Sequence, residues 1–227
     1  MDRLGAALAR LGKSSSESVV VTGASNLAAR RAAKANRRKA IVAQKRKAEA
    51  AGSTPAGQVA RAAALPVRDC LCTENLFEIG MGTLTLARGS TAGSVVVGAC
   101  LLDTFCRGVK DVMIRTMSGE EFEAYVDKLD DATPLVPVDP GHARKLLRDL
   151  TRWSGSLGFQ PHRDFATVER LFGDVDPQAC DTTFEFGMNG KPLYTSGPGE
   201  ASAASRRDVE QLRAQLGPDG FHYMVAV

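Results

Sequence analysis

The sequence predicts an α+β protein: a single domain with a mainly antiparallel sheet and three or four helices, preceded by a flexible basic arm. Nine of the eighteen residues from Arg30 to Lys47 are Lys or Arg, and none of them is acidic. Most aromatic residues lie after residue 76, where short β-branched runs alternate with stretches of helical periodicity. We therefore expect a disordered or conditionally helical basic arm and linker over residues 1–65, and an α+β globular domain over residues 66–227.

The charge of the chain is divided between these two parts. Residues 1–65 hold 13 basic and 3 acidic residues, a net charge of +10, whereas the rest of the chain holds 16 basic and 23 acidic residues, a net charge of −7. The only large apolar residues between Leu27 and Ala51 are Leu27, Ile41 and Val42, so a helix there has almost nothing to bury. We expect this arm to become ordered on a polyanion, and AGSTPAG at 51–57 to act as a linker.

The domain should open with strands. Residues 67–74 alternate loosely, and residues 82–88 place two leucines on one face of a strand. The run 94–106 is apolar on both faces, which is typical of a central strand. GSTAG at 89–93 separates the last two segments, so they should form a hairpin.

Helices should follow. Ser118 and Glu121 have the spacing of a capping box, which starts a helix over residues 118–129. Asp139 precedes Pro140 at the start of a longer helix that ends at Gly158. This second helix carries one continuous face that should pack on a sheet or another helix: Ala143, Leu146, Leu147, Leu150, Ser154 and Leu157.

The last third of the sequence continues the α+β pattern. Asp164 should cap a shorter helix that runs through Phe172. Asn189–Gly190 predicts a hairpin turn between residues 182–187 and 191–196. Residues 205–217 are amphipathic, and residues 221–227 should form a closing strand.

Composition excludes several classes. No apolar run approaches the roughly 20 residues that span a bilayer, and no secretory signal is evident, so no membrane association is predicted. The five cysteines are odd in number, which favours reduced thiols and a cytoplasmic protein. Cys70 and Cys72 would share one face of a strand, and buried apolar thiols are favoured over a zinc site. The Arg-, Ala- and Ser-rich N-terminal segment leaves an organellar transit peptide as the alternative.

The densest group of polar residues is LLDTFCRGVKD at 101–111. Asp103 and Asp111 could bind a divalent metal for phosphodiester hydrolysis, with Glu185 and Asp164 completing the shell. In the alternative interpretation the two aspartates form turns, Gly108 adopts a positive φ and Lys110 pairs with a carboxylate.

LGFQPHRDF at 157–165 is the second candidate. His162 follows a helix stop and Pro161, and it could act as a general base, although no nucleophile partner is evident. The alternative is a capping corner. His142 and His222 show no metal-ligand spacing, so no metal site built on histidine is predicted.

LLDTFCRGVKD, LGFQPHRDF and FEFGMNGKPLYTSGP occur here in this order. Together they resemble a widespread family of uncharacterised bacterial proteins, in which a basic N-terminal arm precedes a body with these motifs. The resemblance covers about residues 66–198 and implies no established activity. Some members carry a Cys-rich metal-binding tail, but this chain has no cysteine after Cys180, so that implication does not extend to it.

The favoured function is a non-enzymatic nucleic-acid- or ribosome-associated factor, with RNA favoured over DNA and no cofactor or metal. The arm would supply sequence-independent phosphate contacts. A metal-dependent hydrolase or nuclease that uses Asp103, Asp111 and Glu185 is the second hypothesis. A protein-interaction module whose arm is a targeting segment is the third. The residues predicted to contact nucleic acid are Arg30, Arg31, Lys34, Arg37, Arg38, Lys39, Lys45, Arg46 and Lys47.

Overall fold

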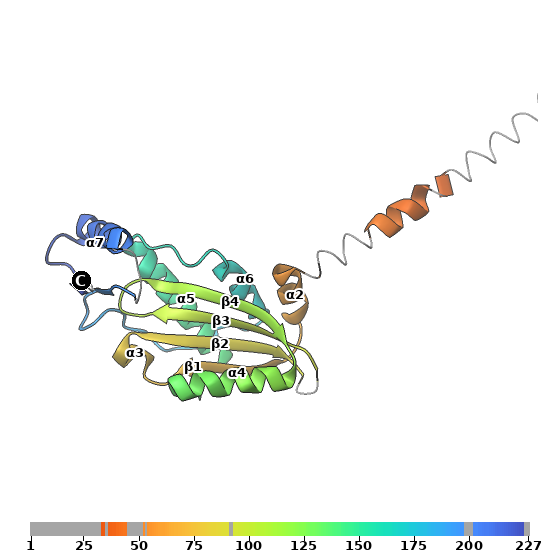
Figure 1. Ribbon diagram of the computed structural model, residues 1–227, viewed down its shortest axis with the longest axis horizontal. Helices are drawn as coiled ribbons and strands as arrows, with labels where there is room; N and C mark the ends of the chain where they lie inside the picture. Colours follow the sequence, from red (N-terminus) through yellow and green to blue (C-terminus); the bar gives the residue numbers. More distant parts are fainter. Residues whose placement is uncertain are drawn as a thin grey trace, which may run out of the picture. The chain divides into compact units, whose positions relative to one another are not determined.

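The computed structural model describes residues 33–34, 36–44, 52, 54–90, 93–197 and 202–224. The chain divides into two units, one up to Ala51 and a second from Gly52 to Val227. The second unit contains a five-stranded antiparallel sheet with helices on both of its faces, so the predicted α+β class is confirmed (Figure 1).

The sheet has the strand order β4-β3-β2-β1-β5. Its strands are β1 (Val67–Thr73), β2 (Met81–Gly89), β3 (Val95–Asp103), β4 (Gly108–Met117) and β5 (Leu135–Pro137). The predicted hairpin is confirmed, because β2 and β3 pair from Met81↔Asp103 to Gly89↔Val95. β3 lies between β2 and β4, so it is an interior strand, as its apolar sequence indicates, although β2 occupies the centre of the sheet.

Strand β4 was not predicted. The polar residues after Cys106 indicated a turn, but the chain reverses within residues 104–107 and pairs again with β3 from Gly108 onward. A bulge between Leu101 and Leu102 shifts the register of this pairing, which weakens the alternation that would mark a strand.

Helices α5 (Pro140–Ser156), α6 (Phe165–Leu171) and α2 (Pro55–Ala62) pack on one face of the sheet and share its main core. Asp139 Oδ1 accepts hydrogen bonds from the backbone N–H groups of Gly141 and His142, so the predicted cap of α5 is confirmed. The predicted face of α5 is also confirmed, because all six of its residues are buried: Ala143, Leu146, Leu147, Leu150, Ser154 and Leu157.

Helix α4 (Gly119–Ala132) covers part of the opposite face of the sheet (Figure 1). Its Phe122 packs with Ala87, Val95 and Val97 in a separate small core. The capping box is present in both directions, because Ser118 Oγ accepts from Glu121 N and Glu121 Oε2 accepts from Ser118 N.

The boundary at residue 66 was placed too late. The stretch that the sequence indicated as linker begins α2, where Thr54 Oγ1 accepts from Gly57 N and Pro55 occupies the first turn. Val59 and Ala62 of α2 are 1% exposed and belong to the main core. Helix α2 is therefore part of the folded unit. A second short helix, α3 (Leu76–Ile79), follows β1 and was not predicted either.

The C-terminal part consists of a 3-10 turn η1 (Pro177–Ala179), β6 (Leu193–Thr195), α7 (Ser202–Leu216) and β7 (His222–Met224). β6 and β7 pair in parallel. Asn189 and Gly190 both have positive φ, as the Asn-Gly turn requires, but the flanking residues form only the isolated bridge Met188↔Lys191. The turn is confirmed, whereas residues 182–187 do not form the predicted strand.

Candidate functional site

The three sequence motifs meet at the turn between β3 and β4. Gly187 N donates to Thr104 O at 2.9 Å, and Leu193 N donates to Phe105 O at 2.9 Å, so the third motif is held against this turn. His162 N donates to Val109 O at 3.0 Å, which holds the second motif there as well. Segments distant in the sequence are thus joined by backbone hydrogen bonds.

Asp103 organises this turn. Its Oδ1 accepts from Phe105 N at 3.1 Å and from Cys106 N at 2.8 Å, and the residue is only 3% exposed. Burial raises the pKa of the Asp103 carboxyl, while Lys110 and the backbone N–H donors act in the opposite direction. The carboxylate oxygen that satisfies two N–H groups in the turn is therefore committed to local structure.

The other candidate carboxylates lie in different surroundings. Asp111 is on β4, where it pairs with Leu101 of β3, and its side chain is 73% exposed. Glu185 is exposed and lines a cavity beside β5 and α5. Within the described residues, no group of three or more His, Cys, Asp or Glu side chains comes together in a way that could hold a metal ion.

His162 lies between two carboxylates. Its Nε2 is 3.7 Å from Asp111 Oδ1, and its Nδ1 is 3.9 Å from Asp164 Oδ2. Nδ1 also accepts a hydrogen bond from Asp164 N at 3.3 Å. Asp164 occupies the N-cap of α6, but its side chain makes no capping hydrogen bond to this helix. The predicted side-chain cap by Asp164 is therefore wrong, although backbone hydrogen bonds of His162 to Val109 and Phe165 do form a corner here.

Four of the five cysteines are buried, and all five are free thiols. Burial raises the pKa of Cys70 to about 12, of Cys72 to about 11 and of Cys100 to about 12. Burial also raises the pKa of Cys106, and the negative charge of Asp103 raises it further. These thiols behave as small apolar core residues, as expected from the sequence.

An aromatic cavity was missed by the sequence analysis. It has a volume of about 640 Å³, and Phe77, Phe184 and Phe186 stack along it with ring centroids 5.9–6.2 Å apart. Phe184 and Phe186 alternate with the exposed Glu185, and this alternation is the signal that could have placed both aromatic rings on one side of the segment. The ring of Phe186 also contacts the ring of Trp153, with centroids 5.3 Å apart.

A thiol and an imidazole meet beside this cavity, which is lined by His142 and Thr182. Cys180 Sγ is 3.5 Å from His142 Nδ1, and Thr182 Oγ1 is 3.5 Å from the same nitrogen. The His142 ring also meets Phe184 edge to face, with centroids 5.0 Å apart. Neither the pair nor the cavity was predicted, because His142 and Cys180 lie far apart in the sequence.

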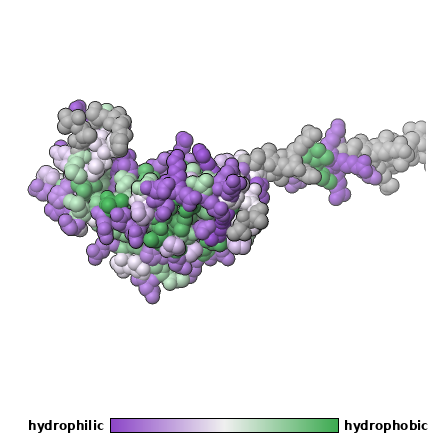
Figure 2. All heavy atoms as spheres, turned by 60° about the horizontal axis from the view of Figure 1, so that its bottom comes forward, coloured by the Kyte–Doolittle hydropathy of each residue, from purple (hydrophilic) through white to green (hydrophobic). Residues whose placement is uncertain are grey.

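The described part of the arm is exposed. Residues 36–44 are helical, and Lys34, Arg37, Arg38 and Lys39 all have exposed side chains. Ile41 and Val42 are 56% and 51% exposed, and they form the small green patch on an otherwise mainly purple segment in Figure 2. The other predicted contacts lie outside the described residues: Arg30, Arg31, Lys45, Arg46 and Lys47.

No known protein family, curated protein or solved structure matches this chain. The resemblance of the three motifs to a bacterial family therefore stays a prediction. Among the described residues, no helix has the length and apolar character needed to cross a membrane.

Proposed function

We propose that this chain is a non-enzymatic nucleic-acid- or ribosome-associated factor that is held on RNA through its basic arm. The observation that carries the proposal is the separation of charge, with +10 on residues 1–65 and −7 on the rest. The described basic side chains of the arm are exposed. Such side chains neutralise phosphates and release counterions, which favours binding to any nucleic-acid sequence.

The body supports a tethering function. Two of the polar residues that suggested chemistry are engaged in structure, since Asp103 caps a turn and His162 holds a corner. The arm would contact RNA while the body is presented to another component. A cytoplasmic site of action belongs to this proposal, because the five thiols are free.

The test measures the salt dependence of binding to single-stranded RNA by fluorescence anisotropy. If all nine basic residues contact phosphates, log affinity should fall with log salt with a slope of about −6. Replacing Arg37, Arg38 and Lys39 by Gln should make this slope shallower by about 2.

The matched control is the triple change of Arg206, Arg207 and Arg213 to Gln, which removes the same charge from exposed positions on α7. This control should leave the slope unchanged. Equal losses in the two triple variants, or a slope near zero for the natural chain, would show that the arm is not the binding element.

A further inference from the structure

Strand β4 is an edge strand. It is ten residues long and ends the order β4-β3-β2-β1-β5, so among the strands that the structure describes it pairs only with β3. Figure 1 shows it along the upper border of the sheet. A long edge strand offers a row of N–H and C=O groups to which another strand can pair.

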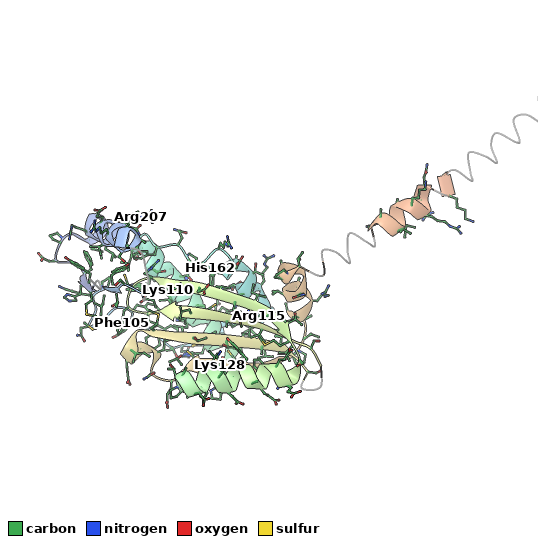
Figure 3. All side chains as sticks on the ribbon, viewed as in Figure 1. Phe105, Lys110, Arg115, Lys128, His162 and Arg207 are labelled. Atoms are coloured by element: carbon green, nitrogen blue, oxygen red, sulfur yellow. The ribbon has the colours of Figure 1, made fainter. Side chains whose placement is uncertain are left out.

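Hydrogen bonds show which residues of β4 face outward. Val109 O accepts from His162 N, which comes from the corner beyond the edge of the strand (Figure 3). Val112 N donates to the side chain of its own neighbour Asp111 at 2.8 Å. Because backbone groups of alternate residues point to the same edge, Ile114 and Thr116 share the outward direction of Val112.

Beyond the corner, no other strand in the described ranges pairs with this edge. A hollow of about 610 Å³ runs along residues 111–114, and its other walls are Thr54, Pro55, Ala56, Asp164 and Thr167. The corner at His162 therefore closes only the first residues of β4. Val112, Met113 and Ile114 give this open stretch an apolar sequence.

The sequence of β4 is complementary to itself. When two copies of β4 are paired antiparallel about a two-fold axis at Met113, Val112 lies opposite Ile114. The backbone N–H and C=O groups of both residues point out of the sheet edge, so they can pair with each other. The same register places Asp111 opposite Arg115 of the other copy, twice in each pair. Both side chains are exposed.

Other registers do not pair these charges. An axis at Val112 places Asp111 opposite Met113, and an axis at Ile114 places it opposite Met117. Opposite charges that face each other across two strands stabilise the pairing, and positions without backbone hydrogen bonds bring their side chains closest. The Met113 register is thus selected by charge as well as by backbone direction.

We propose that the outer edge of β4 binds a second copy of this chain, so that two sheets join through β4 in the Met113 register. This interface does not depend on the basic arm or on RNA. In the dimer Asp111 leaves the N–H of Val112, which then donates to Ile114 of the other copy. The groups that stabilise the interface are two sets of backbone hydrogen bonds and two Asp111–Arg115 pairs.

The test uses the full-length chain, freed of nucleic acid by nuclease treatment. Sedimentation equilibrium at about 0.15 M salt keeps the charge pairs from being fully screened. We expect a reversible dimer as the protein concentration rises from about 1 to 200 µM. Asp111→Arg and Arg115→Asp each place like charges opposite one another, so each should raise the dissociation constant about tenfold or more.

The double variant D111R/R115D restores opposite charges in reversed order and should recover most of the affinity. The control pair is Asp127→Arg and Lys128→Asp, which makes the same changes at exposed positions of α4, outside the edge strand. These control variants should dimerise as the natural chain does.

Hydrogen exchange adds a residue-specific readout. On dimerisation the amides of Val112 and Ile114 should exchange more slowly, whereas the amide of Met113, which faces β3, should change little. A chain that stays monomeric at the highest concentration would overturn the proposal and leave the edge to a strand of another protein. A dimer that neither single variant weakens, or that the double variant does not recover, would overturn it too.

Discussion

Gly108 lies where the turn after β3 meets α5, and the contact between them can be tested by substitution. Its φ is +73°, and a Cβ at this position would lie 2.3 Å from Ser154 Oγ and 2.7 Å from Ser154 Cβ. The left-handed conformation costs a residue with a side chain about 1–2 kcal/mol. Overpacking against a buried neighbour costs about 1–3 kcal/mol more. Gly108→Ala should therefore lower the free energy of unfolding by about 2–5 kcal/mol.

A matched control separates these two costs. Gly190 has a φ of +77°, and a Cβ there would meet no atom within 4 Å. Gly190→Ala should therefore cost only the conformational part, about 1–2 kcal/mol. Both variants are compared by urea unfolding, with the fluorescence of Trp153 as the signal.

Removing the neighbour should relieve the clash. Ser154→Gly alone should cost about 1 kcal/mol, because glycine weakens a helix. In the double variant this change gives the new methyl group room, so the two effects should be less than additive by about 1–3 kcal/mol. Strict additivity, or equal losses for Gly108→Ala and Gly190→Ala, would refute the close packing of the turn against α5.

Two further predictions concern titratable groups. Burial raises the pKa of Asp103 above its ordinary value of 3.8, so the folded state binds this proton more tightly than the unfolded state. The protonated Asp103 carboxyl contributes fully to stability at pH values below its pKa in the unfolded state. This contribution is lost as the pH rises through its pKa in the folded state. Urea unfolding across the acidic range should show the natural chain losing stability relative to Asp103→Asn as pH rises, and a constant difference would contradict this. In native protein at pH 8, Ellman's reagent should modify Cys180 alone, because burial raises the pKa of the other four thiols; all five should react after unfolding. Rapid reaction of a second thiol in the native protein would show that the core is more open.

Elements with strong local signals were predicted well. The apolar face of α5 repeats with helical spacing over four turns, and Asp139 with Pro140 marks its start. The capping box at Ser118 depends on two residues three positions apart, so no tertiary information is needed to recognise it. The hairpin of β2 and β3 needs only two apolar runs and a turn between them.

Elements that depend on tertiary contacts were missed. β4 begins with polar residues and a bulge, and its place in the sheet follows from pairing with β3. The same polar residues suggested a site, and their environments could not be deduced from spacing alone: Asp103 is buried in a turn, whereas Asp111 faces solvent. Helix α2 has a Gly- and Ala-rich sequence typical of a linker, and it is held by burial of Val59 and Ala62.

The order of the strands has a consequence for how the sheet is assembled. β1 pairs with β2, β2 with β3 and β3 with β4, so each of these pairings closes only a short stretch of chain. Loop closure then costs little entropy, and contacts between near neighbours in sequence form quickly. β5 is different, because the chain leaves β4 at one edge of the sheet and must cross to the opposite edge, where β5 pairs with β1. The four-stranded meander can therefore grow one hairpin at a time as the polypeptide leaves the ribosome, before α5 is available to cover it.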